Sequence, residues 1–354
     1  MTLDGGLSDS STIDASLPLN PIISATRLVS VLDDSFVDID VDWHRQLAYV
    51  SSRETAACLY VVDFSNELTP TIVRILGAAD GTGGRCLGST ISETGQHLFL
   101  TSWLNNQLEY WRLDDDPREA TRISALTVNY PRDVVFDEAN HVLYVIQGQP
   151  TPGFSRIDIA GDGSLSLIDS YALPLCNLHY NGAALLRGSL LTGCADDNSP
   201  AEIIDAASLT SIDSIDMSHH DLSGFWTASS FEEIGFLGGW VSGFFEFDMT
   251  LGRAVLASRF DNAGGYRDSA FVRRDATRLL FAVGSFGYVD VFDASLPRAP
   301  RLVSRTHLME VESELYGVAI HADSRRALLV TNRSQFIIVD IDRLEPATMD
   351  WPSY

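Results

Sequence analysis

Short apolar runs alternate with turn residues along the whole chain and do not lengthen into a helical stripe. The runs are rich in Val, Ile, Tyr and Phe, and Gly, Asp, Asn and Pro separate them, a pattern typical of β-strands joined by tight turns. Near the end of the chain the pattern predicts strands at 315–320, 326–331 and 335–340. The sequence therefore predicts an all-β protein.

The apolar pattern also repeats, with a period of about 46 residues. Seven runs end in an aspartate that we interpret as a turn residue: Asp63, Asp114, Asp158, Asp205, Asp248, Asp293 and Asp340. Apolar residues upstream of these aspartates keep the same spacing. Four-stranded propeller blades have this period, so seven copies predict a seven-bladed β-propeller in a single domain at 14–354.

The two ends of the chain predict how the ring closes. Residues 14–30 repeat the pattern of 293–304 with five extra residues, which is the end of a blade without its beginning. The final repeat has only three clear strands, so we expect the segment at 27–31 to complete the last blade as its fourth strand and to cover an open sheet edge. Residues 1–13 are polar and are predicted to be disordered or loosely attached.

The repeats resemble those of the LVIVD-repeat β-propellers, in which an aliphatic run ending in Ile/Val-Asp precedes a Ser-Asn-Pro-like turn and a Leu-Val strand. The matching segments are 59–73, 288–304 and 336–340. The repeats around Trp111, Arg156 and Ile204 lack the full turn motif. The resemblance implies a propeller fold and a range of binding roles, but it does not imply one activity.

Charge restricts the partners. The chain has 48 acidic and 24 basic residues and a formal net charge of -24 at pH 7, which disfavours nucleic acid and anionic membranes. Every basic residue is an arginine, so no internal lysine can form a Schiff base.

The cysteines and the first residues bear on location. Cys58, Cys86, Cys176 and Cys194 are scattered without a Cys-x-x-Cys pair, which favours four buried thiols over disulfides or a zinc site. The first six residues lack the features of a secretory signal, and no apolar run reaches the length of a membrane span. We therefore expect a cytoplasmic protein, although a mature chain without its signal would look the same.

Candidate binding residues lie in the loops that lead into the inner strands and in those that join second to third strands. In a propeller these loops surround one mouth of the central channel. Arg85, Arg132 and Arg267 could converge there on a carboxylate or phosphate. The alternative is that Arg132 and Arg267 pair with the adjacent Asp133 and Asp268 as structural bridges.

The same loops supply aromatic and catalytic candidates. The residues that could stack on a ligand or contact it are Trp103, Trp240 and Tyr316. The acid-base candidates are His179, His220 and Asp268 in these loops and Asp40 on the first inner strand, in a stretch at 38–42 that alternates carboxylate and aliphatic residues. Each has a structural alternative, and Asp40 in particular is either a channel base or metal ligand, or a partner for the neighbouring blade. The remaining histidines, His44, His97, His141, His307 and His321, are placed away from this mouth and set aside.

Two functions fit these residues. One is an enzyme that binds a small anionic metabolite at the channel mouth and acts as a lyase, isomerase, cyclase or hydrolase through His/Asp chemistry. The other is a propeller scaffold without catalysis that binds a protein or peptide, for which the acidic surface favours a basic partner. No cofactor or metal-ligand set is predicted, and a divalent metal stays open. Substrate and oligomeric state are not predicted.

Overall fold

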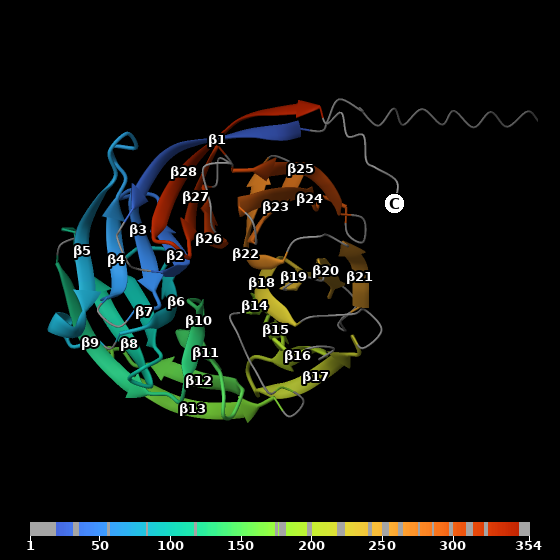
Figure 1. Cartoon of the computed structure of the whole chain (residues 1–354). Helices are drawn as coiled ribbons and strands as arrows, with labels where there is room; N and C mark the ends of the chain where they lie inside the picture. Colours follow the sequence, from blue (N-terminus) through green and yellow to red (C-terminus); the bar gives the residue numbers. More distant parts are fainter. Residues whose placement is uncertain are drawn as a thin grey trace, which may run out of the picture.

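The chain forms a ring of seven four-stranded antiparallel sheets in a computed structural model (Figure 1), which confirms the predicted seven-bladed β-propeller. The structure describes residues 19–30, 35–54, 57–82, 84–116, 119–173, 176, 182–196, 200–217, 224–239, 243–249, 255–260, 265–274, 277–284, 287–296, 300–308, 314–321 and 325–346. A short 3-10 helix, η1 (Ala78–Asp80), follows Gly77. Within these ranges no helix is long and apolar enough to cross a membrane.

Each blade contributes one strand to each of four positions, from the channel outward. The inner strands are β2 (Phe36–Asp42), β6 (Cys86–Ile91), β10 (Pro131–Asp137), β14 (Ala183–Leu186), β18 (Phe225–Phe231), β22 (Tyr266–Arg274) and β26 (Leu315–Ile320). The second strands are β3 (Leu47–Ser52), β7 (His97–Ser102), β11 (Val142–Gln147), β15 (Ser189–Gly193), β19 (Ile234–Gly239), β23 (Thr277–Gly284) and β27 (Arg326–Thr331). The third strands are β4 (Ala57–Asp63), β8 (Gln107–Leu113), β12 (Gly153–Ile159), β16 (Ala201–Asp205), β20 (Phe244–Asp248), β24 (Tyr288–Asp293) and β28 (Gln335–Pro346). The outer strands are β5 (Thr71–Gly77), β9 (Ala120–Thr127), β13 (Leu165–Ala172), β17 (Thr210–Ile215), β21 (Val255–Phe260), β25 (Arg301–His307) and β1 (Leu19–Ser30). Blade one starts at β2 and blade seven at β26.

The N-terminal strand closes the ring as predicted. In Figure 1, β1 (blue) lies beside β28 (red), and the two pair antiparallel from Leu19 with Pro346 to Ser30 with Gln335. The strand begins well before the predicted segment at 27–31, and β28 extends beyond the predicted 335–340. Because β1 occupies the outer edge of blade seven, β28 is not left as an open edge. Residues 1–13 lie outside the described residues.

Hydrophobic side chains fill the spaces between neighbouring blades. Tyr49 of blade one, for example, packs in one buried cluster with Leu98 and Trp111 of blade two. At the ends of the third strands, Asp63 and Asp205 accept backbone N–H bonds from residues two and three positions further along. This confirms the turn role that the repeat predicts for them.

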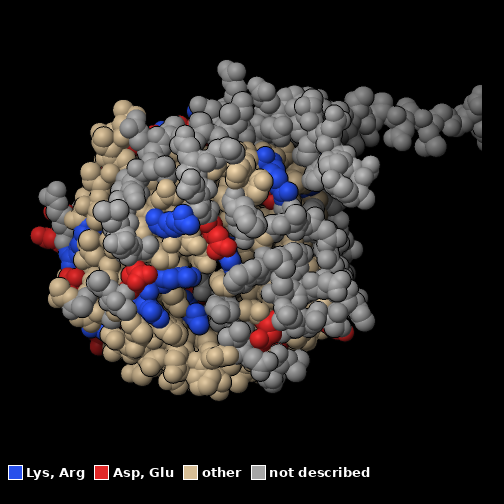
Figure 2. Space-filling view, in the orientation of Figure 1, with Lys and Arg blue, Asp and Glu red and all other residues tan. Residues whose placement is uncertain are grey.

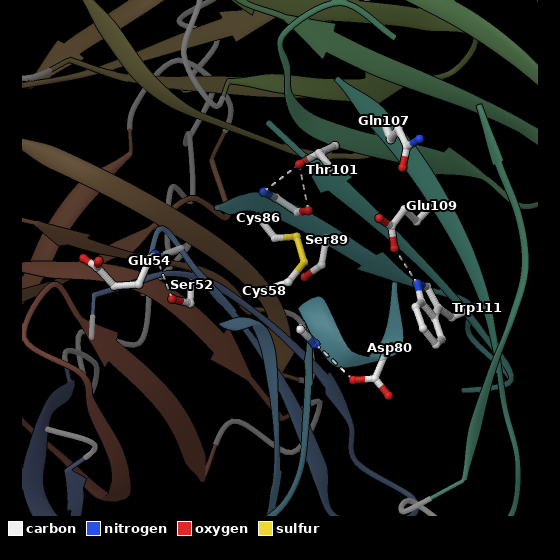
Figure 3. Close-up of a disulfide and its surroundings, with 12 residues drawn as sticks. Ser52, Glu54, Cys58, Asp80, Cys86, Ser89, Thr101, Gln107, Glu109 and Trp111 are labelled. Carbon is white, nitrogen blue, oxygen red and sulfur yellow. Dashed lines mark hydrogen bonds between the residues drawn. A yellow bond between two sulfur atoms is a disulfide. The ribbon is translucent and has the colours of Figure 1, made fainter. Parts of the chain in front are cut away.

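The four cysteines form two disulfides, so the prediction of free thiols was wrong. Figure 3 shows Cys58 of β4 bonded to Cys86 at the start of β6, with 4.8 Å between their Cα atoms. Cys176, in the connection from blade three to blade four, pairs with Cys194 after β15 at 5.6 Å. Both Cα distances are normal for disulfides. The stacking of blades brings the partners together, which their spacing along the chain does not reveal.

Candidate functional site at the channel mouth

Five of the inner strands share a β-bulge just after their first paired residue, where the chain enters the channel. In β2, β10, β18, β22 and β26 one residue is skipped in the register with the second strand. A bulge re-aims a side chain and is typical of functional rims. The skipped residues are Val37, Arg132, Trp226, Arg267 and Tyr316. The repeat therefore presents five side chains of four kinds at one equivalent position around the mouth.

An aspartate follows the bulge in three blades, and two of these residues clamp neighbouring blades together. Asp38 accepts the backbone N–H of Ser89 on the next inner strand at 2.9 Å. Asp268 does the same for Val318 at 2.8 Å, and its other oxygen accepts the N–H of Ser269 at 2.8 Å. Both oxygens of Asp268, which the sequence suggested as catalytic, are therefore engaged, and one of them joins blades six and seven.

Asp133 occupies the same position but is less constrained. Its Oδ1 accepts the N–H of Val134 at 2.8 Å, and no hydrogen bond to a described residue engages Oδ2. Gly88 of blade two lies directly against it, since a Cβ on Gly88 would be 2.5 Å from Asp133 Oδ1. Among the described residues no ion pair joins Arg132 to Asp133 or Arg267 to Asp268. The structural bridges between these neighbours, which the sequence offered as an alternative, are therefore not observed. Asp133 thus has an oxygen left for a ligand.

The channel carboxyl groups are difficult to ionise. They are largely surrounded by protein. Burial raises the pKa of Asp268 to about 8, and the charge of Asp38 adds to the effect. Burial, followed by repulsion from Asp38, also raises the pKa of Asp40 and of Asp133 well above the usual range. Asp40 lies further along β2 and accepts a 2.5 Å hydrogen bond from the Ser89 hydroxyl. Asp268 therefore keeps its proton at neutral pH, and ionisation of Asp40 and Asp133 is disfavoured.

Arg267 is fixed among aromatic rings and one carboxylate. The residue is only 4% exposed, and its Nη2 lies 3.1 Å from both carboxylate oxygens of Glu314. Its guanidinium carbon lies 4.2 Å from the ring centroid of Trp226 and 5.2 Å from that of Tyr316. These contacts hold the guanidinium rigidly and neutralise part of its charge.

Arg85 and Arg132 flank one indole ring. Their guanidinium carbons lie 5.6 and 5.4 Å from the ring centroid of Trp103. Arg85 has a positive φ of 60°, and its backbone is held by bonds from its N–H to Glu54 O and from Trp103 N–H to its own carbonyl. No ion pair links Arg85 to a described residue, so its charge is available to an anion. Figure 2 shows arginine side chains (blue) gathered near the centre of the face it presents.

Some of the candidate residues at the channel mouth line a small cavity. Its volume is about 50 Å³, and Asp133, Arg267, Asp268 and Tyr316 are among its lining residues. The structure thus brings together Arg267, Asp268 and Tyr316 from the predicted set. Arg85, Arg132 and Trp103 form a second group at the same mouth, on blades two and three. His179, His220 and Trp240 lie outside the described residues.

Two residues at the mouth were missed by the sequence analysis: Trp226 stacks on Arg267, and Arg53 lies 5.2 Å from the ring of Tyr316. Asp133, which the sequence suggested only as a partner of Arg132, lines the cavity. Trp226 could have been found by aligning the repeats on the bulge, because it occupies the position of Arg132 and Arg267. Among the described residues no group of three or more His, Cys, Asp or Glu side chains is arranged to hold a metal ion.

Comparison with known proteins returns no match to a family model and none to a curated protein sequence. Membership of the LVIVD-repeat family is therefore a proposal that rests on the repeats themselves. A propeller fold hosts both enzymes and scaffolds, so function has to be argued from the site.

Proposed function

We propose that the protein is an enzyme that binds a small anionic metabolite at the channel mouth and transforms it by acid-base chemistry. The observation that carries the proposal is that two arginines lie against one indole ring at the mouth where β10 also carries the partly unbonded carboxyl group of Asp133, directly after Arg132. Such a reaction needs cations that select an anion and a carboxylic acid whose ionisation is disfavoured.

Binding is assigned to Arg85 and Arg132. The guanidinium fork matches a carboxylate or phosphate in a bidentate manner, and the face of Trp103 holds both side chains in place. Arg267 already contacts Glu314, so we assign it a supporting role in shaping the cavity. The selected ligand is an anion small enough to lie at the channel mouth.

Proton transfer is assigned to Asp133. Because burial raises its pKa well above the usual range, the acid keeps its proton to higher pH than an ordinary aspartate and can donate it to a bound substrate or take one back afterwards. Elimination, isomerisation, cyclisation and hydrolysis are compatible with this chemistry, and none requires a lysine. His179 and His220 stay predicted as additional acid-base groups. No cofactor is proposed.

The disulfides bear on location. Disulfides persist mainly in oxidising compartments, and each of the two joins buried cysteines. We therefore propose an oxidising compartment in place of the cytoplasm that the sequence suggested.

Calorimetric titration with succinate and inorganic phosphate tests the binding step. Arg85→Ala and Arg132→Ala should each weaken binding at least about tenfold, corresponding to about 1.4 kcal/mol. Arg301→Ala, which removes an exposed arginine of outer strand β25, should leave binding unchanged. Equal affinities in all four proteins would overturn the assignment of the arginines.

Product formation from a library of small carboxylates and phosphates, followed by mass spectrometry, tests catalysis. Asp133→Asn should keep the binding of anions but lower turnover about 100-fold or more, the usual contribution of a general acid or base. Wild-type turnover in that variant contradicts the role of Asp133. If neither anion binds and a basic peptide does, the scaffold is the correct function.

A further inference from the structure

A second, larger cavity of about 380 Å³ lies between blades two and three, away from the channel mouth. The turn from β6 to β7, the turn from β10 to β11 and the turn from β12 to β13 surround it. These turns lie at the ends of the strands opposite the bulges, so the cavity opens on the other face of the ring. Its volume is in the range of small-molecule sites.

Aromatic rings form its wall. Phe99 and Tyr110 of blade two stack at 4.9 Å between ring centroids, and Phe136 of blade three lies 5.0 Å from Phe99. All three line the cavity. A flat apolar wall of this kind favours a planar, largely apolar ligand.

The polar groups of the cavity differ in charge. His97 Nδ1 lies 2.7 Å from the Tyr110 hydroxyl. Burial lowers the pKa of His97, with Glu138 opposing and His141 adding to the effect, so the imidazole is neutral at neutral pH. Because burial also raises the pKa of Tyr110, its hydroxyl keeps its proton and donates to Nδ1. The Nε2–H of His97 is then a donor for a ligand.

Glu138 supplies the negative group. Its Oε2 accepts the backbone N–H of Glu93 at 2.8 Å, which fixes the carboxylate at the boundary of the two blades. No hydrogen bond to a described residue engages Oε1, and Glu138 lines the cavity. A half-buried carboxylate with an available oxygen attracts a cation or a hydrogen-bond donor.

At the boundary between blades seven and one, an aromatic side chain takes the place that Glu138 has at the boundary between blades two and three. Trp43 follows the last residue of β2, as Glu138 follows the last residue of β10. Trp43 packs against Phe64 and, at 4.9 Å, against His321 of blade seven. Where that boundary carries a bulky indole, the boundary of blades two and three carries a short carboxylate beside an open cavity.

The cavity is held in shape from both blades. Ser124 of β9 donates a 2.6 Å hydrogen bond to the carbonyl of Gly163 in the turn of blade three. Gly163 has a positive φ of 83°, and a Cβ there would lie 2.5 Å from Ile123 and 3.0 Å from the Tyr110 ring. A preformed site loses little conformational entropy when a ligand binds.

We propose that this cavity is a binding site for a small aromatic amine, with the ring against Phe99, Tyr110 and Phe136 and the ammonium group on Glu138. This site is separate from the channel mouth and does not depend on the function proposed there.

Titration of the whole protein with phenethylamine at pH 8, followed by calorimetry, tests the proposal. Phenethylamine should bind at least about tenfold more tightly than 2-phenylethanol and 3-phenylpropionate, which keep the ring but lack the positive charge. Glu138→Gln should reduce that preference over 2-phenylethanol to about twofold or less. Glu119→Gln, which makes the same change at an exposed carboxylate outside the cavity, should leave the preference unchanged.

Blocking the cavity provides a second readout. A Cβ on Gly161, which lines the cavity, meets no atom within 4 Å. Gly161→Ala should therefore preserve binding, and Gly161→Phe should weaken it at least about tenfold. Undetectable binding of phenethylamine, equal or tighter binding of 3-phenylpropionate, or unchanged binding by Gly161→Phe would each overturn the proposal.

Discussion

A rise in pH is expected to destabilise the fold through Asp268. Burial raises the pKa of this carboxyl group from 3.8 to about 8. Between these two values the folded protein holds a proton that the unfolded chain has released. Because the folded state then binds more protons, the free energy of unfolding falls as the pH rises from about 4 to 8. The stabilisation is complete below this window and lost above it.

The size of this pH effect follows from a difference of one bound proton between the folded and unfolded states. A difference of one bound proton changes the free energy of unfolding by about 1.4 kcal/mol per pH unit, which over the window sets an upper limit of about 6 kcal/mol. Asp40 and Asp133, whose pKa values are also raised, add losses of the same sign.

Urea unfolding at several pH values between 5.5 and 8.5 measures the effect. Asp268→Asn loses a bond of the clamp between blades, so its stability is lower throughout, but its slope against pH should be shallower by about 1 kcal/mol per pH unit below pH 7.5. Asp169→Asn, at an exposed position of β13, should keep the wild-type slope. If the wild-type and Asp268→Asn slopes are equal, the carboxyl group is ionised in the folded protein and the reasoning is refuted.

Three further changes test the architecture, the first two by the same urea unfolding. Gly88→Ala should destabilise the protein by about 1–3 kcal/mol, because the new Cβ would lie 2.7 Å from the Cα of Asp133; a neutral effect would contradict that close approach. The double change of Cys58 and Cys86 to serine should cost about 3–4 kcal/mol for a bridge that spans 28 residues, and thiol titration of the unchanged protein should find no free thiol. Deletion of residues 1–30 removes β1 and exposes the edge of β28, so light scattering should detect aggregation, and a soluble monomer would argue against closure by this strand.

The fold could be predicted because the repeated pattern consists of the apolar residues that form the strands and of the turn residues that end them. The predicted strands at 315–320 and 326–331 coincide with β26 and β27, where apolar runs end at turn residues. The third strand of that blade is longer than its predicted 335–340 because pairing with β1 continues to Pro346, and a distant partner leaves no local signal. The disulfides were missed for the same reason.

The candidate site was predicted only in part because adjacency in sequence says little about partners across blades. The sequence allowed Arg267 to pair with its neighbour Asp268. In the structure the bulge turns the two side chains apart, so that Arg267 contacts Glu314 while Asp268 reaches Val318. The equivalent position of Trp226 was not recognised either, since a bulge shifts register by one residue and is invisible to a count of apolar positions.

Departures from the repeat indicate where function lies, because structural residues recur at equivalent positions and functional residues need not. Asp38 and Asp268 repeat one clamp, whereas Asp133 at the same position keeps an oxygen unbonded to the described residues and lies against Gly88. On the opposite face, Glu138 replaces the kind of bulky side chain that closes the boundary of blades seven and one. Both departures fall at the boundary of blades two and three, so that boundary is where variants should separate ligand binding from folding.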